Sequence, residues 1–153
     1  MITPDTPAGV LMEVLAVLST SFSPLNLPKS SALILALLYA FRRPLNCSEI
    51  QNLTGYSKSA VSAALKVLES HRLVHKVKSG RKNIYVTSLP LPRLVAEAHL
   101  RALRSTAERL REISRRSPQL LESIDHLDSE LSKAILAIEA SLYGVDGKST
   151  VEG

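Results

Sequence analysis

The sequence predicts a mostly α-helical protein with one short β-hairpin. Apolar residues recur at helical spacing along most of the chain, and residues 93–116 contain neither Gly nor Pro. Near the middle, two short runs of β-favouring residues flank a polar loop that contains Gly80. The 153-residue chain is 45% apolar and 22% charged, which is typical of a globular protein that buries a core. Because Trp is absent and only 4% of residues are aromatic, that core must be aliphatic.

The first forty residues predict two helices joined by a linker. Apolar positions in residues 10–18 have helical spacing, and two prolines indicate a linker over residues 19–28. Residues 29–41 are apolar on nearly every side, so this helix should be central to the core. The longest uninterrupted apolar run, residues 32–41, is too short to cross a bilayer. The N-terminal segment also lacks the basic region of a secretory signal, so we expect a cytoplasmic protein without a membrane partner.

The strongest local signals lie in residues 46–71. Asn46 followed by Glu49 matches a capping box, and Gly55 supplies a turn at a helix C-terminus. Ser57 then caps a second helix that runs to about His71. Two short helices joined by a tight turn predict a helix-turn-helix, with two ordinary packed helices as the alternative.

The second of these helices has two different faces. Its inward face is apolar, and its outward face is small or polar, which would let the backbone approach base edges in a DNA groove. The inward residues are Val61, Leu65 and Leu68, and the outward residues are Ser59, Ala60, Ser62, Ala63 and Lys66. The outward face has no Arg, Asn or Gln in mid-helix for a bidentate base contact, so sequence discrimination per half-site should be modest.

A basic hairpin follows directly. Residues 76–78 and 84–87 favour strands, and residues 79–83 form the polar loop between them. A helix-turn-helix followed by such a hairpin is the layout of a winged helix. Lys78, Arg81 and Lys82 would lie against a DNA backbone, or Arg81 would enter a narrow minor groove. The alternative is a solvated turn.

The last third of the chain predicts two long helices, residues 93–116 and about 118–142. Apolar residues of the second helix alternate steps of four and three, a spacing that can seat against another helix or a second chain. Residues 144–153 are small and polar, and we expect them to be disordered. The expected parts are an N-terminal arm and dimerisation helix (1–28), a winged helix (29–88), C-terminal dimerisation helices (89–143) and a disordered tail (144–153).

Charge is distributed unevenly along the chain. The net charge of +5 divides into −1 for residues 1–40, +11 for residues 41–116 and −5 for residues 117–153. A basic centre suggests a polyanion partner, with a solvated basic face as the alternative. For the arginines of residues 93–116 we favour a solvated face with the local pairs Glu97–Arg101 and Glu112–Arg116 over contacts with phosphates or an acidic partner.

Residues 31–87 resemble the winged helix of MarR-type regulators, in a pattern similar to the GbsR-like branch and to archaeal relatives. The matching segments are Leu37-Leu38-Tyr39, Pro44-Leu45, Ser48-Glu49-Ile50, Gly55 to Ser62, Leu65, Leu68-Glu69, Leu73-Val74 and Gly80 to Tyr85. The resemblance implies a dimeric transcription regulator whose outer helices form the dimer interface. The chain departs from the common pattern at His71-Arg72, where a Gly usually precedes the Leu-Val pair, and in its sparse base-reading face.

No residue pattern predicts catalysis, a metal or a cofactor. A single Cys excludes an intramolecular disulfide framework and a multi-cysteine zinc site. His71 and His75 are four apart, but the chain should change from helix to strand between them, while His99 and His126 should face solvent. The chain has no phosphate-binding loop and no nucleophile elbow, so we expect no enzyme. Cys47 is expected to be a buried structural residue, with a redox-responsive thiol as the alternative.

The sequence therefore predicts a cytoplasmic, nucleoid-associated homodimer that binds double-stranded DNA and regulates transcription. The alternative is an architectural or adaptor protein that binds DNA with little sequence preference or binds another protein. A small-molecule effector is left open. The expected DNA-binding residues are Ser57, Lys58, Ser59, Ser62, Ala63 and Lys66 on the second helix and Lys78, Arg81 and Lys82 on the wing.

Overall fold

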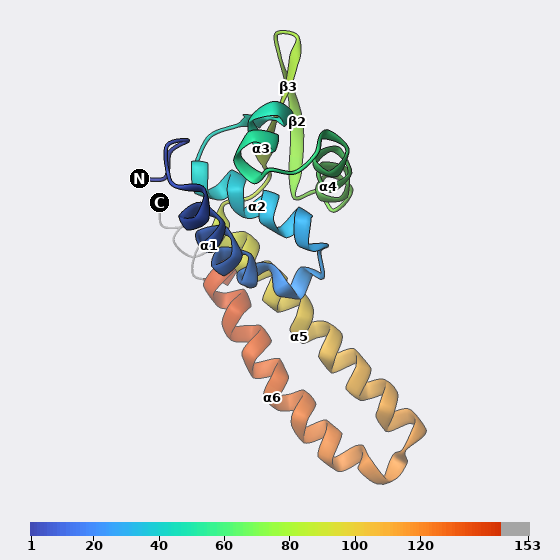
Figure 1. Cartoon of the computed structure of the whole chain (residues 1–153). Helices are drawn as coiled ribbons and strands as arrows, with labels where there is room; N and C mark the ends of the chain where they lie inside the picture. Colours follow the sequence, from blue (N-terminus) through green and yellow to red (C-terminus); the bar gives the residue numbers. More distant parts are fainter. Residues whose placement is uncertain (145–153) are drawn as a thin grey trace. The chain divides into compact units, whose positions relative to one another are not determined.

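The computed structural model describes residues 1–144, so the predicted disordered tail lies, apart from its first residue, outside the described residues. The protein is mostly helical with one small antiparallel sheet, as predicted (Figure 1). The chain divides into two compact units, residues 1–91 and residues 92 onward. The elements are α1 (Ala8–Ser19), the 3-10 helix η1 (Thr20–Leu25), α2 (Lys29–Phe41), β1 (Leu45–Asn46), α3 (Cys47–Thr54), α4 (Lys58–Ser70), β2 (Val74–Ser79), β3 (Lys82–Thr87), α5 (Leu91–Arg116), η2 (Pro118–Leu120), α6 (Leu121–Glu139) and the π-helical η3 (Ala140–Gly144).

Helix α2 is the centre of the first unit. Eight of its thirteen residues are buried, including the fully buried Ile34, Leu35 and Leu37. Helices α1, α3 and α4 and strand β3 all contact it. The prediction from its all-round apolar character is therefore confirmed, because a helix with no polar face must be covered on nearly all sides.

Helix α1 and η1 cover one side of α2. Leu11 and Leu15 face inward and are 2% and 0% exposed. The linker predicted for residues 19–28 is wrong over Thr20–Leu25, because these residues form η1 and bury Phe22 against the ring of Tyr39, with ring centroids 6.1 Å apart. A chain segment that buries an aromatic ring gains enough from that burial to be ordered.

The stretch Ala8–Leu25 is also more apolar than the uninterrupted runs of the sequence indicate. It has 18 residues with a mean hydropathy of 1.5, enough by length and composition to cross a membrane, and 17% of it is buried in the protein. Polar residues such as Glu13 interrupt this stretch, so no uninterrupted apolar run of the sequence reveals its length. Its outward side exposes Val10, Val14 and Val17, which are 49%, 37% and 71% exposed.

The sheet has the strand order β1-β3-β2, and all its pairs are antiparallel. The hairpin register places Val74 opposite Thr87 and Ser79 opposite Lys82. Strand β1, which the sequence analysis did not predict, pairs Leu45 with Tyr85. A two-residue strand carries too short a pattern to be recognised from sequence, and it forms here because β3 offers a free edge.

The capping box predicted at Asn46 is present. The Asn46 side chain accepts a hydrogen bond from the Glu49 N–H at 2.9 Å, and Glu49 accepts one from the Asn46 N–H at 3.0 Å. Glu49 also pairs with Arg43, with Nη2 and Oε2 2.9 Å apart. Burial raises the pKa of the Glu49 carboxyl, but hydrogen bonds from Arg43 and the Asn46 backbone, with the charges of Arg43 and Lys82, outweigh it and hold the pKa below its ordinary value.

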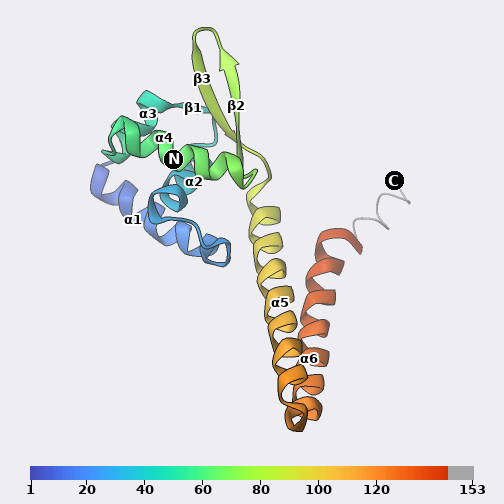
Figure 2. The same ribbon diagram turned by 90° about the vertical axis from the view of Figure 1, so that its right-hand side faces the viewer.

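The second unit is an antiparallel hairpin of α5 and α6, which lie side by side in both views (Figures 1 and 2). Arg104 pairs with Glu139 at 2.6 Å, and Arg111 binds both carboxylate oxygens of Asp128 at 2.9 and 3.2 Å. Ile124 is buried in this hairpin. Helix α5 begins two residues earlier than predicted, and the second predicted helix is divided into η2, α6 and η3.

We expect Glu49→Gln to lower the free energy of unfolding at pH 7 by about 0.2–1 kcal/mol, the range of partly exposed ion pairs. Because the folded-state pKa of Glu49 lies below its unfolded value, its stabilisation is present above the unfolded pKa and is lost as pH falls through the folded pKa. The difference between variant and wild type should therefore shrink toward pH 3. Urea unfolding at several pH values measures it, with Glu13→Gln on the exposed face of α1 as the control. A difference independent of pH would contradict the assigned ion pair.

Candidate nucleic-acid interface

Helices α3 and α4 form the predicted helix-turn-helix. Gly55 ends α3 with a φ of 76°, in the left-handed region that favours glycine, and its N–H bonds the carbonyl of Gln51 at 2.8 Å. Ser57 caps α4, because its hydroxyl accepts a hydrogen bond from the Ala60 N–H at 3.1 Å. The turn and both caps are local devices, so residue type and spacing were enough to predict them.

The two faces of α4 are as predicted. Val61, Leu65 and Leu68 are at most 1% exposed and pack inward. The outward residues Ser57, Lys58, Ser59, Ala63 and Lys66 are exposed, while Ala60 and Ser62 are half-buried. The outward face therefore presents hydroxyls and a methyl group at its centre, with Lys58 and Lys66 bounding it.

A buried hydrogen bond fixes α4 on the core helix. The Ser31 hydroxyl of α2 donates to the Ala64 carbonyl of α4 at 3.2 Å, and Ser31 is 0% exposed. A buried hydroxyl is costly unless it is hydrogen-bonded, so this contact favours one placement of α4 along α2. The role of Ser31 could not be recognised from the sequence, because a Ser near a helix N-terminus carries no signal for a partner 33 residues away.

The wing is longer and its turn tighter than predicted. The loop predicted at residues 79–83 is shorter in the structure, because Ser79, Lys82 and Asn83 belong to the strands, which leaves Gly80 and Arg81 as the turn. Gly80 has a φ of 61°. A two-residue hairpin turn needs such positive φ values, which glycine adopts at no steric cost.

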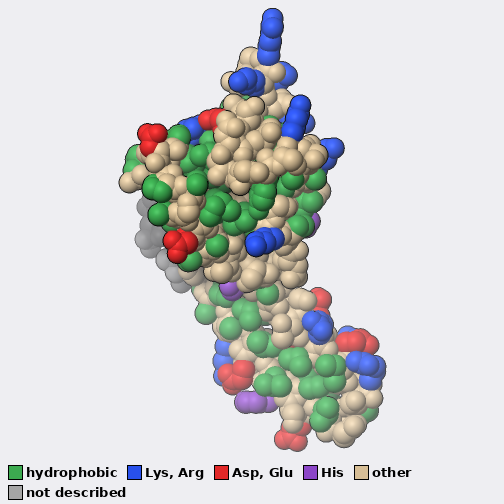
Figure 3. All heavy atoms as spheres, viewed as in Figure 1, with side chains coloured by type: hydrophobic (Ala, Val, Ile, Leu, Met, Phe, Trp, Pro, Cys, Tyr) green, Lys and Arg blue, Asp and Glu red, His purple; other side chains and the backbone are tan. Residues whose placement is uncertain are grey.

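The wing carries its cations without an ion-pair partner in the described chain. Lys78, Arg81 and Lys82 are all exposed, and Lys78 donates to the Arg81 carbonyl at 3.5 Å. In the space-filling view, Lys and Arg side chains gather at the tip of the hairpin (Figure 3). Among residues 1–144, these three cations and Lys58 and Lys66 of α4 form no ion pair within 4.0 Å.

The arginines of α5 differ from these cations because many of them have acidic partners. The predicted pairs Glu97–Arg101 and Glu112–Arg116 are wrong, since Glu97 binds Arg93 and Glu112 binds Arg115 instead. Arg104 and Arg111 pair with α6. Helical spacing allows several partners within one turn, and the partner chosen depends on rotamers and on contacts from the second helix.

The remaining candidate groups lie apart from one another. Cys47 is half-buried at the first position of α3, and its sulfur accepts a hydrogen bond from Gln51 Nε2 at 3.7 Å. His71 and His75 stand at the end of α4 and in β2, and His99 and His126 are exposed, as predicted. Across residues 1–144 no three His, Cys, Asp or Glu side chains come together as metal ligands.

One departure from the expected family pattern has a structural explanation. Arg72 stands where a Gly usually precedes the Leu-Val pair, and its φ is 59°. The turn therefore keeps its left-handed backbone, at a cost in strain of order 1 kcal/mol for a non-glycine residue. The Arg72 N–H bonds the Glu69 carbonyl at 2.9 Å, and the Leu73 N–H bonds the Leu68 carbonyl at 2.9 Å, which closes the turn.

Comparisons with known proteins agree with this architecture. A family model described as MarR family matches residues 25–82. A comparison with curated proteins gives no significant match. Among solved structures, a crystal structure of a transcriptional regulator has a TM-score of 0.63 at 13% identity, covering 90% of this chain and 98% of that one.

Two further structures are less similar. A MarR family regulator from Rhodococcus sp. RHA1 has a TM-score of 0.45 at 20% identity, covering 80% of this chain and 86% of that one. MepR, a transcription regulator of the Staphylococcus aureus efflux pump MepA, has a TM-score of 0.45 at 16% identity, covering 82% of this chain and 93% of that one. The match of residues 25–82 to the MarR family model agrees with the resemblance found in the sequence. The structure at TM-score 0.63, with 13% identity, shows that the fold is shared and no more.

Proposed function

We propose that this chain, whose residues 25–82 form a winged helix of the MarR family, is a homodimeric DNA-binding transcription regulator and not an enzyme. The observation that carries the proposal is the outward face of α4, which is small and exposed at its centre and bounded by Lys58 and Lys66. A face of this kind fits the major groove, where the cations meet phosphates. The wing cations Lys78, Arg81 and Lys82 then contact the flanking backbone, or Arg81 enters the minor groove.

The side chains available to read bases set the expected specificity. Ser59 and Ser62 can hydrogen-bond bases or phosphates, and the Ala63 methyl can touch a thymine methyl. None of these is a bidentate reader, so one half-site discriminates weakly. Pairing two half-sites in a dimer, together with DNA shape, raises the discrimination.

The same sparse face favours a second candidate function, an architectural or adaptor protein. Binding through phosphates alone would coat DNA with little sequence preference, and the α4 face could instead bind another protein. A binding comparison at one fixed salt concentration separates the candidates, using DNA selected from a random pool against unselected DNA. A specific regulator should bind the selected DNA about 10³-fold more tightly or better.

A second copy of the chain is the partner that best fits the exposed apolar surfaces. In the first unit, α1 exposes Val10, Val14 and Val17; in the second, Ile113, Leu120 and Leu127 are 37%, 44% and 48% exposed. Hydrophobic side chains also gather on the visible face of the α5–α6 hairpin (Figure 3). Exposed apolar patches of this kind mark interaction sites.

Charge distinguishes this partner from a lipid surface. Residues 1–28 contain two acids and no Lys or Arg, so an anionic membrane would repel the α1 surface. A second copy carries the same two acids, but it offers an apolar face without the dense negative charge of a lipid surface. We infer a cytoplasmic homodimer that associates with the nucleoid through DNA.

Ala63→Glu tests whether α4 enters the groove. Ala63 is exposed and Glu is a good helix former, so stability should change little. DNA affinity should fall by about one to three orders of magnitude, because the carboxylate is repelled by phosphates and loses its water. Fluorescence anisotropy measures the affinity, and thermal unfolding measures the stability. Leu65→Glu is the contrasting change and should unfold the domain, since Leu65 is 1% exposed. A folded Ala63→Glu protein with wild-type affinity would exclude α4 as the recognition helix.

The double variant Arg81→Ala with Lys82→Ala tests the wing. Affinity should fall for every DNA sequence, and the slope of log K against log salt should lose about 0.9 for each phosphate contact removed per subunit. If Arg81 enters the minor groove, the loss should be greater on A·T-rich flanks. Titrations at several salt concentrations measure the slope. The α5 variant Arg109→Ala is the control, and an unchanged slope in the wing variant would mean that the hairpin does not touch DNA.

Leu127→Glu tests the dimer. We expect the wild-type protein to have twice its 16.7 kDa chain mass at micromolar concentration, and the variant to dissociate because it places a carboxylate in the apolar face. Leu136→Glu is the matched control, since Leu136 is 64% exposed and nine residues, two and a half turns, separate it from Leu127. Light scattering in physiological salt measures the mass. A monomeric wild-type protein, or dissociation by the control alone, would reject this interface.

A further inference from the structure

The exposed side of α4 forms one narrow stripe. Beyond the first residue of the helix, its exposed residues recur at steps of four, three and four, which places them on one line along the helix. They are Ser59, Ala63, Lys66 and Ser70. Ser62 lies beside this stripe and is half-buried. The side chains that would meet base edges first are therefore those of the stripe, and Ser59 and Ser70 are its two hydroxyls.

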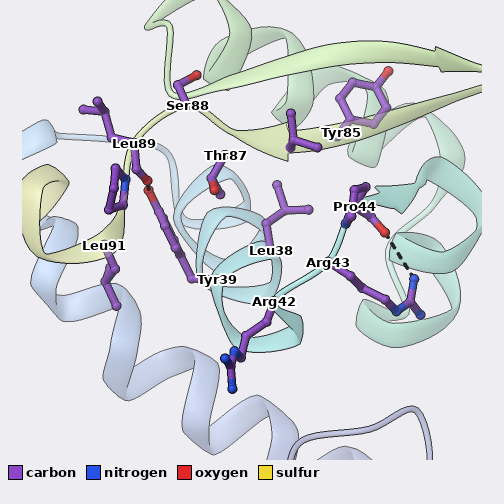
Figure 4. Close-up of a pocket in the computed structure, with 12 residues that line it drawn as sticks. Leu38, Tyr39, Arg42, Arg43, Pro44, Tyr85, Thr87, Ser88, Leu89 and Leu91 are labelled. Atoms are coloured by element: carbon purple, nitrogen blue, oxygen red, sulfur yellow. Dashed lines mark hydrogen bonds between the residues drawn. The ribbon is translucent and has the colours of Figure 1, made fainter.

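A hydroxyl group has one proton, so a hydroxyl that donates to the chain itself has none left for a partner. Ser70 is in this position, because its hydroxyl donates to the Val67 carbonyl at 2.7 Å. Tyr39 of α2 likewise donates to the Leu89 carbonyl at 2.6 Å, a contact that the close-up shows (Figure 4). Ser59 differs from both, since the partner of its hydroxyl is another hydroxyl.

The hydroxyls of Ser57 and Ser59 form this pair at the start of α4. Their Oγ atoms lie 3.2 Å apart, so one hydroxyl donates to the other. The Ser57 oxygen already accepts a hydrogen bond from the Ala60 N–H at 3.1 Å as the helix cap. Accepting a hydrogen bond makes a hydroxyl a better donor, because hydrogen bonds in a chain polarise one another. The favoured direction therefore runs from the Ala60 N–H through Ser57 to Ser59.

The opposite direction leaves one donor poorly used. If Ser59 donated to Ser57, the Ser57 oxygen would accept two hydrogen bonds and its own proton would turn to solvent. In the favoured direction the Ser57 proton is used within the pair, and the Ser59 proton is left for a partner outside the chain. Because Ser59 accepts from Ser57, its own proton is also a stronger donor.

We propose that Ser57 orients Ser59 as a hydrogen-bond donor in the major groove, so that Ser59 selects guanine over cytosine at one position of each half-site. The proposal rests on the proposed function. Guanine presents two acceptors, O6 and N7, at its major-groove edge, whereas cytosine presents an amino donor there. Ser59 is then a specificity-determining residue, and Ser57 is the positioning residue that sets the direction of its hydrogen bond.

Ser59→Ala tests the base contact, with Ser70→Ala as the matched control on the same stripe. DNA selected from a random pool by the wild-type protein supplies the half-site, and each G·C pair in it is inverted to C·G in turn. At one position, inversion should weaken wild-type binding by about three- to tenfold, the range of one hydrogen bond. Ser59→Ala should lose this difference at that position alone, and Ser70→Ala should keep it. Fluorescence anisotropy at one fixed salt concentration measures each affinity.

Ser57→Asp gives a result that a merely structural role would not produce. Asp caps a helix as well as Ser does, so α4 keeps its start. A carboxylate only accepts hydrogen bonds, so the Ser59 proton should turn toward it and leave the Ser59 oxygen as an acceptor in the groove. The preference should therefore reverse to cytosine, whose amino group donates. The added negative charge weakens binding to every DNA, so the ratio between the G·C and C·G sites is the quantity compared.

The outcomes separate this proposal from the proposed function. A guanine preference that persists in Ser59→Ala or in Ser57→Asp would overturn the proposal and leave the regulator standing. An equal loss on all sequences in Ser59→Ala would place this hydroxyl on a phosphate and would also overturn it. Wild-type protein that binds no DNA, or binds all sequences alike, would reject the regulator and the base preference together.

Neutron diffraction from crystals of the protein without DNA tests the direction of the hydrogen bond by itself. The Ser57 deuteron should lie between the two Oγ atoms, with the Ser59 deuteron pointing away from Ser57. A Ser59 deuteron between the two oxygens would overturn the orienting role of Ser57 whatever the DNA results.

Discussion

Burial of α2 is the constraint on which the first unit depends. A helix that is apolar on nearly every side is stable in water only when other elements cover it, and α1, α3, α4 and β3 provide that cover. The few polar groups on α2 then act as anchors. Ser31 holds α4 through the Ala64 carbonyl, and Tyr39 holds the end of the wing through the Leu89 carbonyl.

This arrangement separates the work of holding the fold from the work of contacting a partner. The inward side chains of α4 anchor the helix in the core. The outward side chains are therefore not required for packing and can be small. Because Ala63 and the serines add little bulk, the helix backbone itself can approach a groove. The wing extends this surface, and its pairing with β1 stabilises its base while Arg81 stands at its exposed turn.

Two groups of cations in the chain have different surroundings. Arg104 and Arg111 of α5 meet carboxylates of α6, and those pairs link the two helices of the hairpin. Lys58, Lys66, Lys78, Arg81 and Lys82 meet no carboxylate within ion-pair distance in the described chain. An unpaired cation attracts a polyanion with its full charge, whereas the charge of a paired cation is partly neutralised by the neighbouring carboxylate. The basic centre of the sequence therefore contains two groups of cations, one paired with carboxylates and one unpaired. The unpaired group, on α4 and the wing, is the one available to contact phosphates.

Local features of the first unit could be predicted from the sequence alone, because their causes lie within a few residues. The capping box at Asn46, the left-handed turn at Gly55, the cap at Ser57 and the inward face of α4 all follow from residue type and spacing. The hairpin followed from its β-favouring runs, although the sequence did not show how far the strands continue into the loop. The outward α4 residues and the wing cations could be selected in the same way, since an exposed face is the complement of a buried one.

The tertiary structure alone decided which distant groups meet. The Ser31 side chain donates a hydrogen bond to the Ala64 carbonyl 33 residues away, and Tyr39 donates one to the Leu89 carbonyl 50 residues away. The Arg111 side chain donates to the Asp128 carboxylate 17 residues away. Strand β1 exists only because β3 presents an edge to it, and Phe22 orders η1 only because Tyr39 lies beneath it. Periodicity and capping are properties of one segment of chain. A hydrogen bond or ring contact between two segments depends on how both pack against α2, and no local pattern encodes that packing.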